Sequence, residues 1–227
     1  MEYILKTNDL VKRYGHYEAL NGLTMNVPKG SIYGLVGKNG AGKTTLIRLI
    51  CGLQNPTSGE YSIYGVSNKQ KEIIQSRHRM GAVVETPAIY LDMTAEDNLK
   101  VQHCVLGLPS FDEIPHILKM VGLENTGKKK ARNFSLGMRQ RLGIAVAIVG
   151  SPDFLVLDEP TNGLDPQGIV EMREIILKLN RQHGITILIS SHILDEMARL
   201  ATHFGFIDNG QMIEEISASE LNAACRK

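Results

Sequence analysis

The sequence has little of what would place the chain in a membrane, outside the cell or on nucleic acid. Its formal net charge is only +1, because 25 Lys and Arg residues balance 24 Asp and Glu residues. It therefore has no overall basic field that would attract a polyanion. Its longest apolar stretches, such as residues 144–149 and 154–157, fall far short of the ~18 residues of a membrane-spanning helix. The first ten residues have no basic segment followed by an apolar one, so we expect no export signal.

Cysteines are also scarce. Cys51, Cys104 and Cys225 are an odd number with no C-x-x-C spacing, which argues against a disulfide framework and a zinc site and favours a cytoplasmic location. We find no internal repeat and no low-complexity tract. With 43% hydrophobic residues and 227 residues in total, the chain is expected to fold as one globular domain over 1–227.

The apolar pattern predicts an α/β core. Alternating apolar and polar residues predict half-buried antiparallel strands at 3–10 and 20–27. Continuous apolar runs, typical of central parallel strands, occur at 31–36, 154–157 and 185–189. The remaining expected elements of the core are helices at 44–50 and 166–181 and a hairpin of 203–208 and 211–216 around Asn209-Gly210.

The middle of the chain has no strong strand signal. Residues 84–153 instead contain helical stretches at 95–106, 111–121 and 135–149. We therefore expect segments 1–86 and 151–227 to form the core, which includes an N-terminal antiparallel β subdomain. Residues 87–150 are expected to form an inserted helical lobe.

A glycine-rich loop follows the apolar run at 31–36. It reads Gly37-Lys38-Asn39-Gly40-Ala41-Gly42-Lys43-Thr44, which fits G-x-x-x-x-G-K-[ST] and lies between a predicted strand and a predicted helix. Glycines allow the backbone N–H groups to surround a phosphate, and the helix N-terminus adds partial positive charge. In such a loop Lys43 reaches the β- and γ-phosphates, and the Thr44 hydroxyl ligates Mg²⁺. The alternative, a chance glycine turn, does not explain this context, so we predict a P-loop NTPase core with a mainly parallel central sheet.

An acidic pair follows the apolar run at 154–157. Asp158 and Glu159 are expected at the carboxyl end of a buried strand, where ligands bind in open α/β sheets. Asp158 is the expected partner of Mg²⁺. Glu159 is the expected base that orients or deprotonates water, a role worth roughly 10²- to 10⁴-fold in rate.

Three further segments go beyond a general P-loop protein: residues 134–141 (FSLGMRQR), 162–165 (NGLD) and 190–192 (SSH). Their order around the acidic strand resembles the ATP-binding domain of ABC transporters over essentially the whole chain. Glu85-Thr86-Pro87 and the run S-L-G-M-R-Q-R-L-G resemble in particular the bacitracin- and lantibiotic-resistance exporter ATPases.

The resemblance implies roles for individual residues. Tyr14 matches the aromatic residue on which adenine stacks, and Thr45 would add a hydroxyl to the α-phosphate. His192 matches the histidine that contacts the γ-phosphate. Ser135 and Gly137 belong to the signature segment, which the family places against the nucleotide of the opposite subunit. A serine that caps a helix also stands at an anion-binding end, so the structural and functional interpretations share one geometry.

The chain departs from the family pattern at three positions. Leu136 and Met138 replace the usual glycine and glutamine of the signature segment, which predicts weaker nucleotide-driven closure. Glu85 lies where the family usually has glutamine, in the link between core and lobe. We predict that its carboxylate approaches Mg²⁺ and couples nucleotide occupancy to lobe movement. The alternative is a solvated loop acid.

The resemblance implies an ATP-hydrolysing motor subunit that couples ATP binding and hydrolysis at a head-to-tail dimer interface to export through separate integral membrane permease subunits. The chain would lie on the cytoplasmic face of the cell membrane. A peptide antibiotic such as a lantibiotic or bacitracin is the substrate class that the resemblance suggests. The alternative is a soluble ABC-type ATPase that acts on DNA or ribosomes, but such proteins resemble fused cassettes or heads split by coiled coil. We expect ATP and Mg²⁺ as cofactors, no other metal and no nucleic acid.

Overall fold

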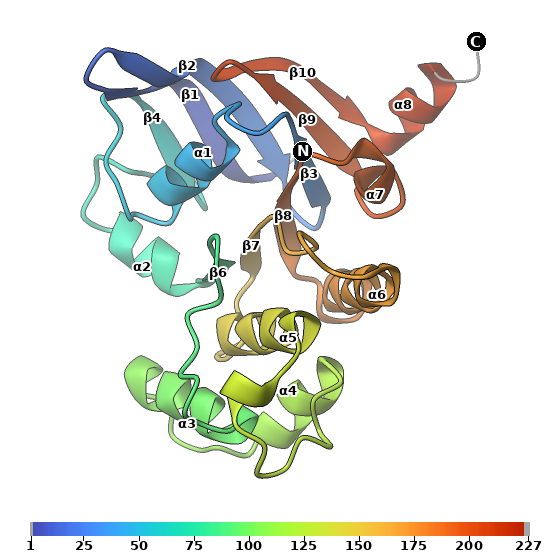
Figure 1. Cartoon of the computed structure of the whole chain (residues 1–227). Coiled ribbons are helices and arrows are strands. Elements are labelled where there is room, and N and C mark those ends of the chain that lie inside the picture. The colour runs from blue at the N-terminus through green and yellow to red at the C-terminus, as the bar shows by residue number, and fades with distance from the viewer. Residues whose placement is uncertain (1, 225–227) are drawn as a thin grey trace.

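The computed structural model describes residues 2–224, in which two sheets and their helices form one body (Figure 1). The third cysteine, Cys225, lies outside the described residues. A four-stranded sheet has the order β2-β1-β4-β5, and a six-stranded central sheet has the order β10-β9-β3-β8-β7-β6.

The four-stranded sheet is antiparallel. It consists of β1 (Tyr3–Tyr14), β2 (Tyr17–Pro28), β4 (Ser58–Ile63) and β5 (Val66–Ser67). The two predicted strands are confirmed, although both are longer than the alternating pattern indicated. Strands β4 and β5 were not predicted, because only Tyr61 and Ile63 of β4 are buried and such a short alternation is a weak signal.

The central sheet is parallel except at one edge. Strands β3 (Ile32–Val36), β6 (Met80–Val83), β7 (Phe154–Asp158), β8 (Thr186–Ser191) and β9 (His203–Asp208) are parallel, and β10 (Gln211–Ser217) returns antiparallel to β9. The turn between β9 and β10 places Asn209 and Gly210 at φ values of 47° and 74°. Both therefore have the left-handed conformation that a tight hairpin turn requires. The predicted parallel sheet and hairpin are confirmed.

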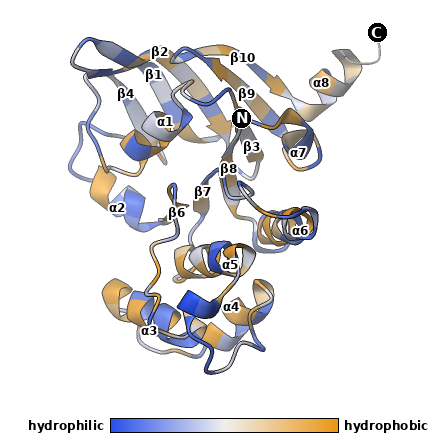
Figure 2. Cartoon of the chain, in the orientation of Figure 1, coloured by the Kyte–Doolittle hydropathy of each residue, from blue (hydrophilic) through white to orange (hydrophobic). Residues whose placement is uncertain are grey.

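The continuous apolar runs reflect burial on both faces of the central sheet. In β7, Phe154 and Val156 belong to the core between the two sheets, whereas Leu155 and Leu157 belong to the core under the helices. Every residue of β3, β7 and β8 is buried. Figure 2 shows hydrophobic residues along β7 and β8, whereas β1, β4 and the outer helices are mixed.

Helices surround the sheets. They are α1 (Lys43–Ile50), α2 (Ile73–His78), α3 (Ala95–Leu106), α4 (Ile114–Met120), α5 (Leu136–Ala147), α6 (Pro166–His183), α7 (Leu194–Ala198) and α8 (Ala218–Ala224), with a 3₁₀ turn at Ala131–Asn133. The five predicted helices are present, but α4 begins three residues after the predicted start at Phe111. The shorter α2, α7 and α8 span two turns at most and were missed. Figure 1 shows α3, α4 and α5 grouped at the end of the molecule away from β1 and β2. No helix within residues 2–224 has the length and apolarity needed to cross a membrane.

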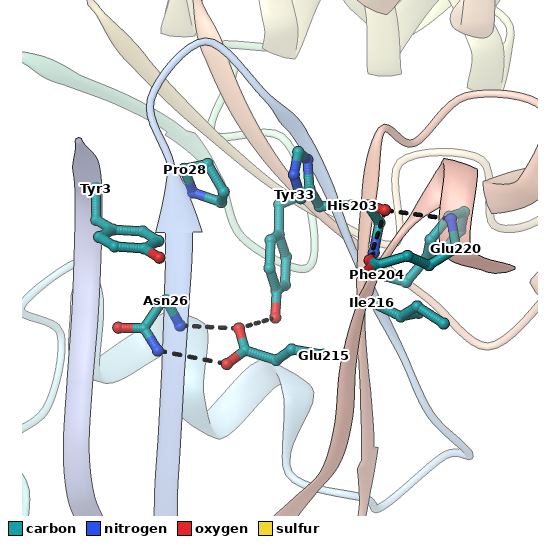
Figure 3. A pocket seen from close by; sticks show the side chains of 10 residues that line it. Tyr3, Asn26, Pro28, Tyr33, His203, Phe204, Glu215, Ile216 and Glu220 are labelled. Atoms are coloured by element: carbon teal, nitrogen blue, oxygen red, sulfur yellow. Dashed lines mark hydrogen bonds between the residues drawn. The ribbon is translucent and has the colours of Figure 1, made fainter. Parts of the chain in front are cut away.

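The carboxylate of Glu215 forms one of the links between the two sheets (Figure 3). Oε1 of Glu215 in β10 accepts hydrogen bonds from the backbone N–H of Asn26 in β2, at 2.9 Å, and from the Tyr33 hydroxyl in β3, at 2.7 Å. The Tyr33 side chain reaches β10 across Gly205, where any side chain would overlap its ring. Burial, followed by the charge of Glu215, holds the pKa of Tyr33 well above its usual value. The phenol therefore stays protonated and remains a donor to Glu215.

We expect Tyr33→Phe to lower the free energy of unfolding by about 1–2 kcal/mol, because the carboxylate loses a donor at the junction of the sheets. Urea denaturation measures this loss. Tyr17→Phe is the matched control, since its hydroxyl is exposed and lies 3.5 Å from the Gly40 carbonyl oxygen. It should change the free energy of unfolding by less than about 0.5 kcal/mol. Equal effects of the two substitutions would contradict the role of Glu215.

Candidate nucleotide site

The glycine-rich loop lies between β3 and α1, as its sequence context predicted. Gly40 and Gly42 have φ values of 83° and 110°, and a side chain at Gly42 would meet the Ala19 carbonyl oxygen at 2.7 Å. Glycine is therefore required at Gly42 for both its conformation and its packing. No side chain caps the N-terminus of α1, and its first turn contains no acidic residue. The loop geometry and the helix end together suit an anion.

Lys43 is buried against this loop. Its ammonium donates hydrogen bonds to the carbonyl oxygens of Gly37, at 2.6 Å, and Lys38, at 3.1 Å. Its side chain is only 5% exposed. The positive charge is therefore held at the loop rather than extended into solvent. Asn39 is exposed, Ala41 is buried, and Thr44 and Thr45 are half-buried in the first turn of α1.

Two neighbouring segments form backbone hydrogen bonds with the loop. The Gly210 N–H donates to the Ala41 carbonyl oxygen at 2.9 Å, and the Gly210 carbonyl oxygen accepts from the Asn21 N–H at 2.9 Å. On the other side, the Gly37 N–H donates to the Ser191 carbonyl oxygen at 3.2 Å. The hairpin turn and the end of β8 therefore both fix the loop backbone.

The acidic pair ends β7 beside this loop. Asp158 is 3% exposed, and its Oδ1 accepts a hydrogen bond from the Ser190 hydroxyl at 2.6 Å. Glu159 has a φ of 50°, a left-handed conformation that is uncommon for a residue other than glycine. Its backbone N–H donates to the oxygen of the same Ser190 hydroxyl at 2.9 Å.

The Glu159 carboxylate joins the three predicted catalytic residues. Its Oε1 lies 3.2 Å from the Lys43 ammonium, and its Oε2 lies 2.7 Å from Nδ1 of His192. The Lys43 and Glu159 side chains are 5% and 20% exposed, so solvent screens their attraction much less than it screens a surface pair. The fold therefore places a carboxylate, an ammonium and an imidazole in direct contact at one edge of the central sheet.

The oxygen donors near the loop fit Mg²⁺. Within residues 2–224, no group of three or more His, Cys, Asp or Glu side chains could hold a metal on its own. Mg²⁺ commonly takes only one or two protein oxygens and completes its octahedron with phosphate oxygens and water. The Thr44 hydroxyl and the Asp158 carboxylate are donors of this kind, so they suit a metal that arrives with a nucleotide.

Glu85 forms an ion pair with Arg48 of α1. The side chain of Glu85 is 52% exposed, and its φ is 59°. Arg48 gave no signal in the sequence beyond a basic residue in the last turn of a helix. The carboxylate would have to leave Arg48 to act as a metal ligand, and that role remains a prediction.

Tyr14 lies at the end of β1 and is 41% exposed. Its hydroxyl donates to the Gln54 side chain, and the Lys12 ammonium lies 5.2 Å from its ring centroid. Tyr17, which was not predicted, reaches the loop with its hydroxyl 3.5 Å from the Gly40 carbonyl oxygen. Part of the Tyr14 ring is therefore open for stacking.

The signature segment begins α5. The Ser135 hydroxyl accepts from the Met138 N–H at 3.2 Å, which confirms the predicted N-cap. Ser135 and Leu136 are exposed, and Gly137 is half-buried. Asp165 caps α6 in the same way, by accepting from the Gly168 N–H at 2.8 Å. In the part of the chain that the structure describes, no hydrogen bond or ion pair joins Ser135 to the Glu159 cluster.

The two described cysteines supply no nucleophile to this site. Burial raises the pKa of the Cys51 thiol, at the end of α1, to about 12, although the Arg77 guanidinium acts in the opposite direction. The Cys51 thiol is therefore protonated at neutral pH. Cys104 lies exposed on α3, in the helical group.

Ser190 is a site residue to which sequence reasoning assigned no role. The available signal was two serines at the end of an apolar strand, where polar residues that are fully buried need partners. A second missed contact is the hydrogen bond of 2.7 Å from the Thr161 hydroxyl to Glu196 in α7. It joins the segment after the acidic pair to the segment after His192.

Comparisons with known proteins agree with this geometry. Residues 20–162 match the family model described as "ABC transporter". The chain is 47% identical to the bacitracin transport ATP-binding protein BcrA of Bacillus licheniformis, over 100% of this chain and 74% of that protein. It is 45% identical to the lantibiotic transport ATP-binding protein SrtF of Streptococcus pyogenes, over 93% of this chain and 90% of the relative.

A solved structure resembles the whole fold. The structure of cbiO1 from Clostridium perfringens, described as part of the ABC transporter complex cbiONQ, aligns with a TM-score of 0.88 at 28% identity. The alignment covers 98% of this chain and 92% of that one. The predicted resemblance and fold class are confirmed, and the chain belongs to the ABC transporter family as an ATP-binding, ATP-hydrolysing subunit.

Proposed function

We propose that this chain drives the export of a peptide antibiotic through separate membrane subunits, with ATP bound at the site around Lys43. The relatives named for bacitracin and lantibiotic transport support this substrate class, since each matches more than nine-tenths of the chain at 45% identity or more. The family assignment supports transport rather than action on DNA or ribosomes.

The observation that carries the catalytic proposal is the position of the Glu159 carboxylate, within 3.2 Å of both the Lys43 ammonium and the His192 ring. Lys43 and the loop from Gly37 to Thr44 bind the phosphates. The γ-phosphate competes with Glu159 for the Lys43 ammonium, which frees the carboxylate to orient water and accept its proton. His192 matches the family histidine that contacts the γ-phosphate, and its ring lies next to Glu159, where it stabilises charge on the γ-phosphate. Thr44 and Asp158 would hold Mg²⁺, which would neutralise phosphate charge.

Glu159→Gln keeps the shape of the side chain and removes the base. We expect ATP binding to persist while steady-state hydrolysis falls by at least about 10²-fold, with ATP-bound dimers accumulating in size-exclusion chromatography. Glu60→Gln is the matched control, because Glu60 pairs with Lys69 in the antiparallel sheet. Hydrolysis by Glu159→Gln within a few-fold of the unmodified chain would refute the assignment of the base.

We further propose that two copies, or this chain and a related one, complete each site. The donors near the γ-phosphate within one chain are Lys43 and His192, and Ser135 with the N-terminus of α5 stands apart from them and exposed. An exposed serine cap at a helix end can receive the phosphate of a partner subunit. Two chains would then enclose two ATP molecules head to tail, and hydrolysis would release the interface.

If Ser135 acts across the interface, mixing Lys43→Ala chains with Ser135→Arg chains should restore ATPase activity. Each mixed dimer then has one site with an intact loop and an intact opposing serine. The specific activity of the unmodified chain should also rise with its concentration. A chain that carries both substitutions is the control. Mixed with either single variant, it should stay inactive at every ratio, because no site then has both an intact loop and an intact opposing serine. Activity that is independent of concentration in the dissociated monomer would exclude the composite site.

We propose that a permease subunit docks on the helical lobe, residues 87–150, near its link to the core. Two neighbouring hollows of about 410 and 450 Å³ share Ala88, Gln102 and Val146 in their linings. Tyr90 and Val105 belong to the second hollow and are 55% and 72% exposed. Exposed apolar side chains around a hollow are typical of a protein interface. Docking there would hold the chain at the cytoplasmic face of the membrane.

Glu85 lies in the link between core and lobe and is the proposed coupling residue. Glu85→Ala should leave ATP binding within a few-fold, yet reduce transport by the assembled complex more than it reduces hydrolysis by the isolated subunit. Arg48→Ala is the control, because it removes only the ion-pair partner. Equal losses in both assays, or no loss in either, would show that Glu85 does not couple the two processes.

A further inference from the structure

The Ser190 hydroxyl contacts both acidic residues of the site. Its hydrogen is donated to Oδ1 of Asp158 at 2.6 Å, and its oxygen accepts the Glu159 N–H at 2.9 Å. Asp158 and Ser190 are also paired residues of adjacent parallel strands, so the backbone register brings them opposite each other. One hydroxyl therefore links the side chain of the expected metal partner to the backbone of the expected base.

Bulk water has little access to this hydroxyl, because Ser190 is 0% exposed and Asp158 is 3% exposed. A hydroxyl is the smallest side-chain group that both donates and accepts. Loss of the hydroxyl would leave a carboxylate oxygen and a backbone N–H short of a partner in the interior, which destabilises this arrangement in particular.

Glu159 needs such a partner because its backbone is strained. With a φ of 50°, it occupies a region that non-glycine residues adopt only when their surroundings hold them there. The Ser190 hydroxyl holds its N–H, and the Glu159 carbonyl oxygen accepts from the Asn162 N–H at 3.1 Å. Two residues after Ser190, His192 holds the Glu159 carboxylate at 2.7 Å. Ser190 at the end of β8 and His192 just after it therefore contact Glu159 at its backbone and its carboxylate.

We propose that Ser190 is a positioning residue for hydrolysis, which fixes the backbone of Glu159 and the carboxylate of Asp158 through one shared hydroxyl. This inference rests on the proposed catalytic role of Glu159. Because Ser190 acts mainly through the backbone of Glu159 and does not itself bind the nucleotide, its removal lowers turnover more than it lowers nucleotide affinity.

The test compares four new variants of the full chain, together with Glu159→Gln, in Mg·ATP hydrolysis, nucleotide binding and thermal unfolding. Ser190→Ala should lower kcat at least about tenfold, with the KM for ATP and the Kd for a fluorescent ADP analogue within about threefold. Ser190→Thr, which restores the hydroxyl, should recover kcat to within about threefold of the unmodified chain. Thr186→Val is the matched control, because Thr186 lies at the other end of β8, is 1% exposed and accepts the Gly30 N–H at 2.9 Å. It should destabilise the chain to a similar extent with kcat unchanged.

The fourth variant combines Ser190→Ala with Glu159→Gln. In single-turnover measurements the double variant should be slower than Glu159→Gln alone by less than about threefold, because most of the effect of Ser190 passes through Glu159. A kcat for folded Ser190→Ala within twofold of the unmodified chain overturns the inference, as does a comparable loss of kcat in Thr186→Val. If Ser190→Ala does not fold, Ser190→Cys is measured instead, and full activity in that weak hydrogen-bonding variant overturns the inference equally. Should Glu159→Gln itself remain active, the proposed base is wrong, and that outcome is distinct from a failure of Ser190 alone.

Discussion

The functional groups of this chain depend on the parallel register of β3, β7 and β8. All three strands are buried on both faces, so polar side chains are tolerated mainly where the strands end. The register pairs Asp158 with Ser190 and Val36 with Ser191, which brings the three carboxyl ends level. The glycine-rich loop, the acidic pair and His192 leave the sheet from this one edge. Lys43 and Glu159 are more than a hundred residues apart in sequence, and the strand register brings their side chains into contact.

The buried Lys43 ammonium at this edge is paired with an acidic side chain. A buried ammonium such as that of Lys43 is costly unless it is hydrogen-bonded and paired. Two carbonyl oxygens of the loop and the Glu159 carboxylate satisfy it here. The same carboxylate contacts His192, so one acidic group serves two basic neighbours. In the proposed function, the triphosphate of ATP brings negative charge to the same place and replaces Glu159 as the partner of Lys43. The Lys43–Glu159 pair is then the contact with which the nucleotide competes.

The sequence predicted the elements that position the site but not all of the contacts within it. The central strands could be predicted because their runs are apolar on both faces. The loop could be predicted because its glycines and Lys43 follow a fixed spacing. The contact between Ser190 and the acidic pair could not be predicted, since strand register is set by the packing of the whole sheet. The pairing of Glu85 with Arg48 was missed for a related reason: the left-handed turn at Glu85 sets the direction of the chain after β6. Short elements such as β5 and α7 contain too few residues for a periodic pattern of apolar side chains to be recognised.

The turn at Gly210 has a consequence for how the site binds. Its N–H and carbonyl oxygen connect the back of the phosphate loop to β2, and a side chain at Gly210 would meet the Ala19 carbonyl oxygen at 2.7 Å. The loop is therefore ordered by folding, and ligand binding need not offset the loss of conformational entropy that ordering the loop would cost. Such preorganisation increases affinity without adding any contact to the ligand. In the proposed function, the hairpin turn at Gly210 thus contributes to phosphate affinity through the order that it gives the loop.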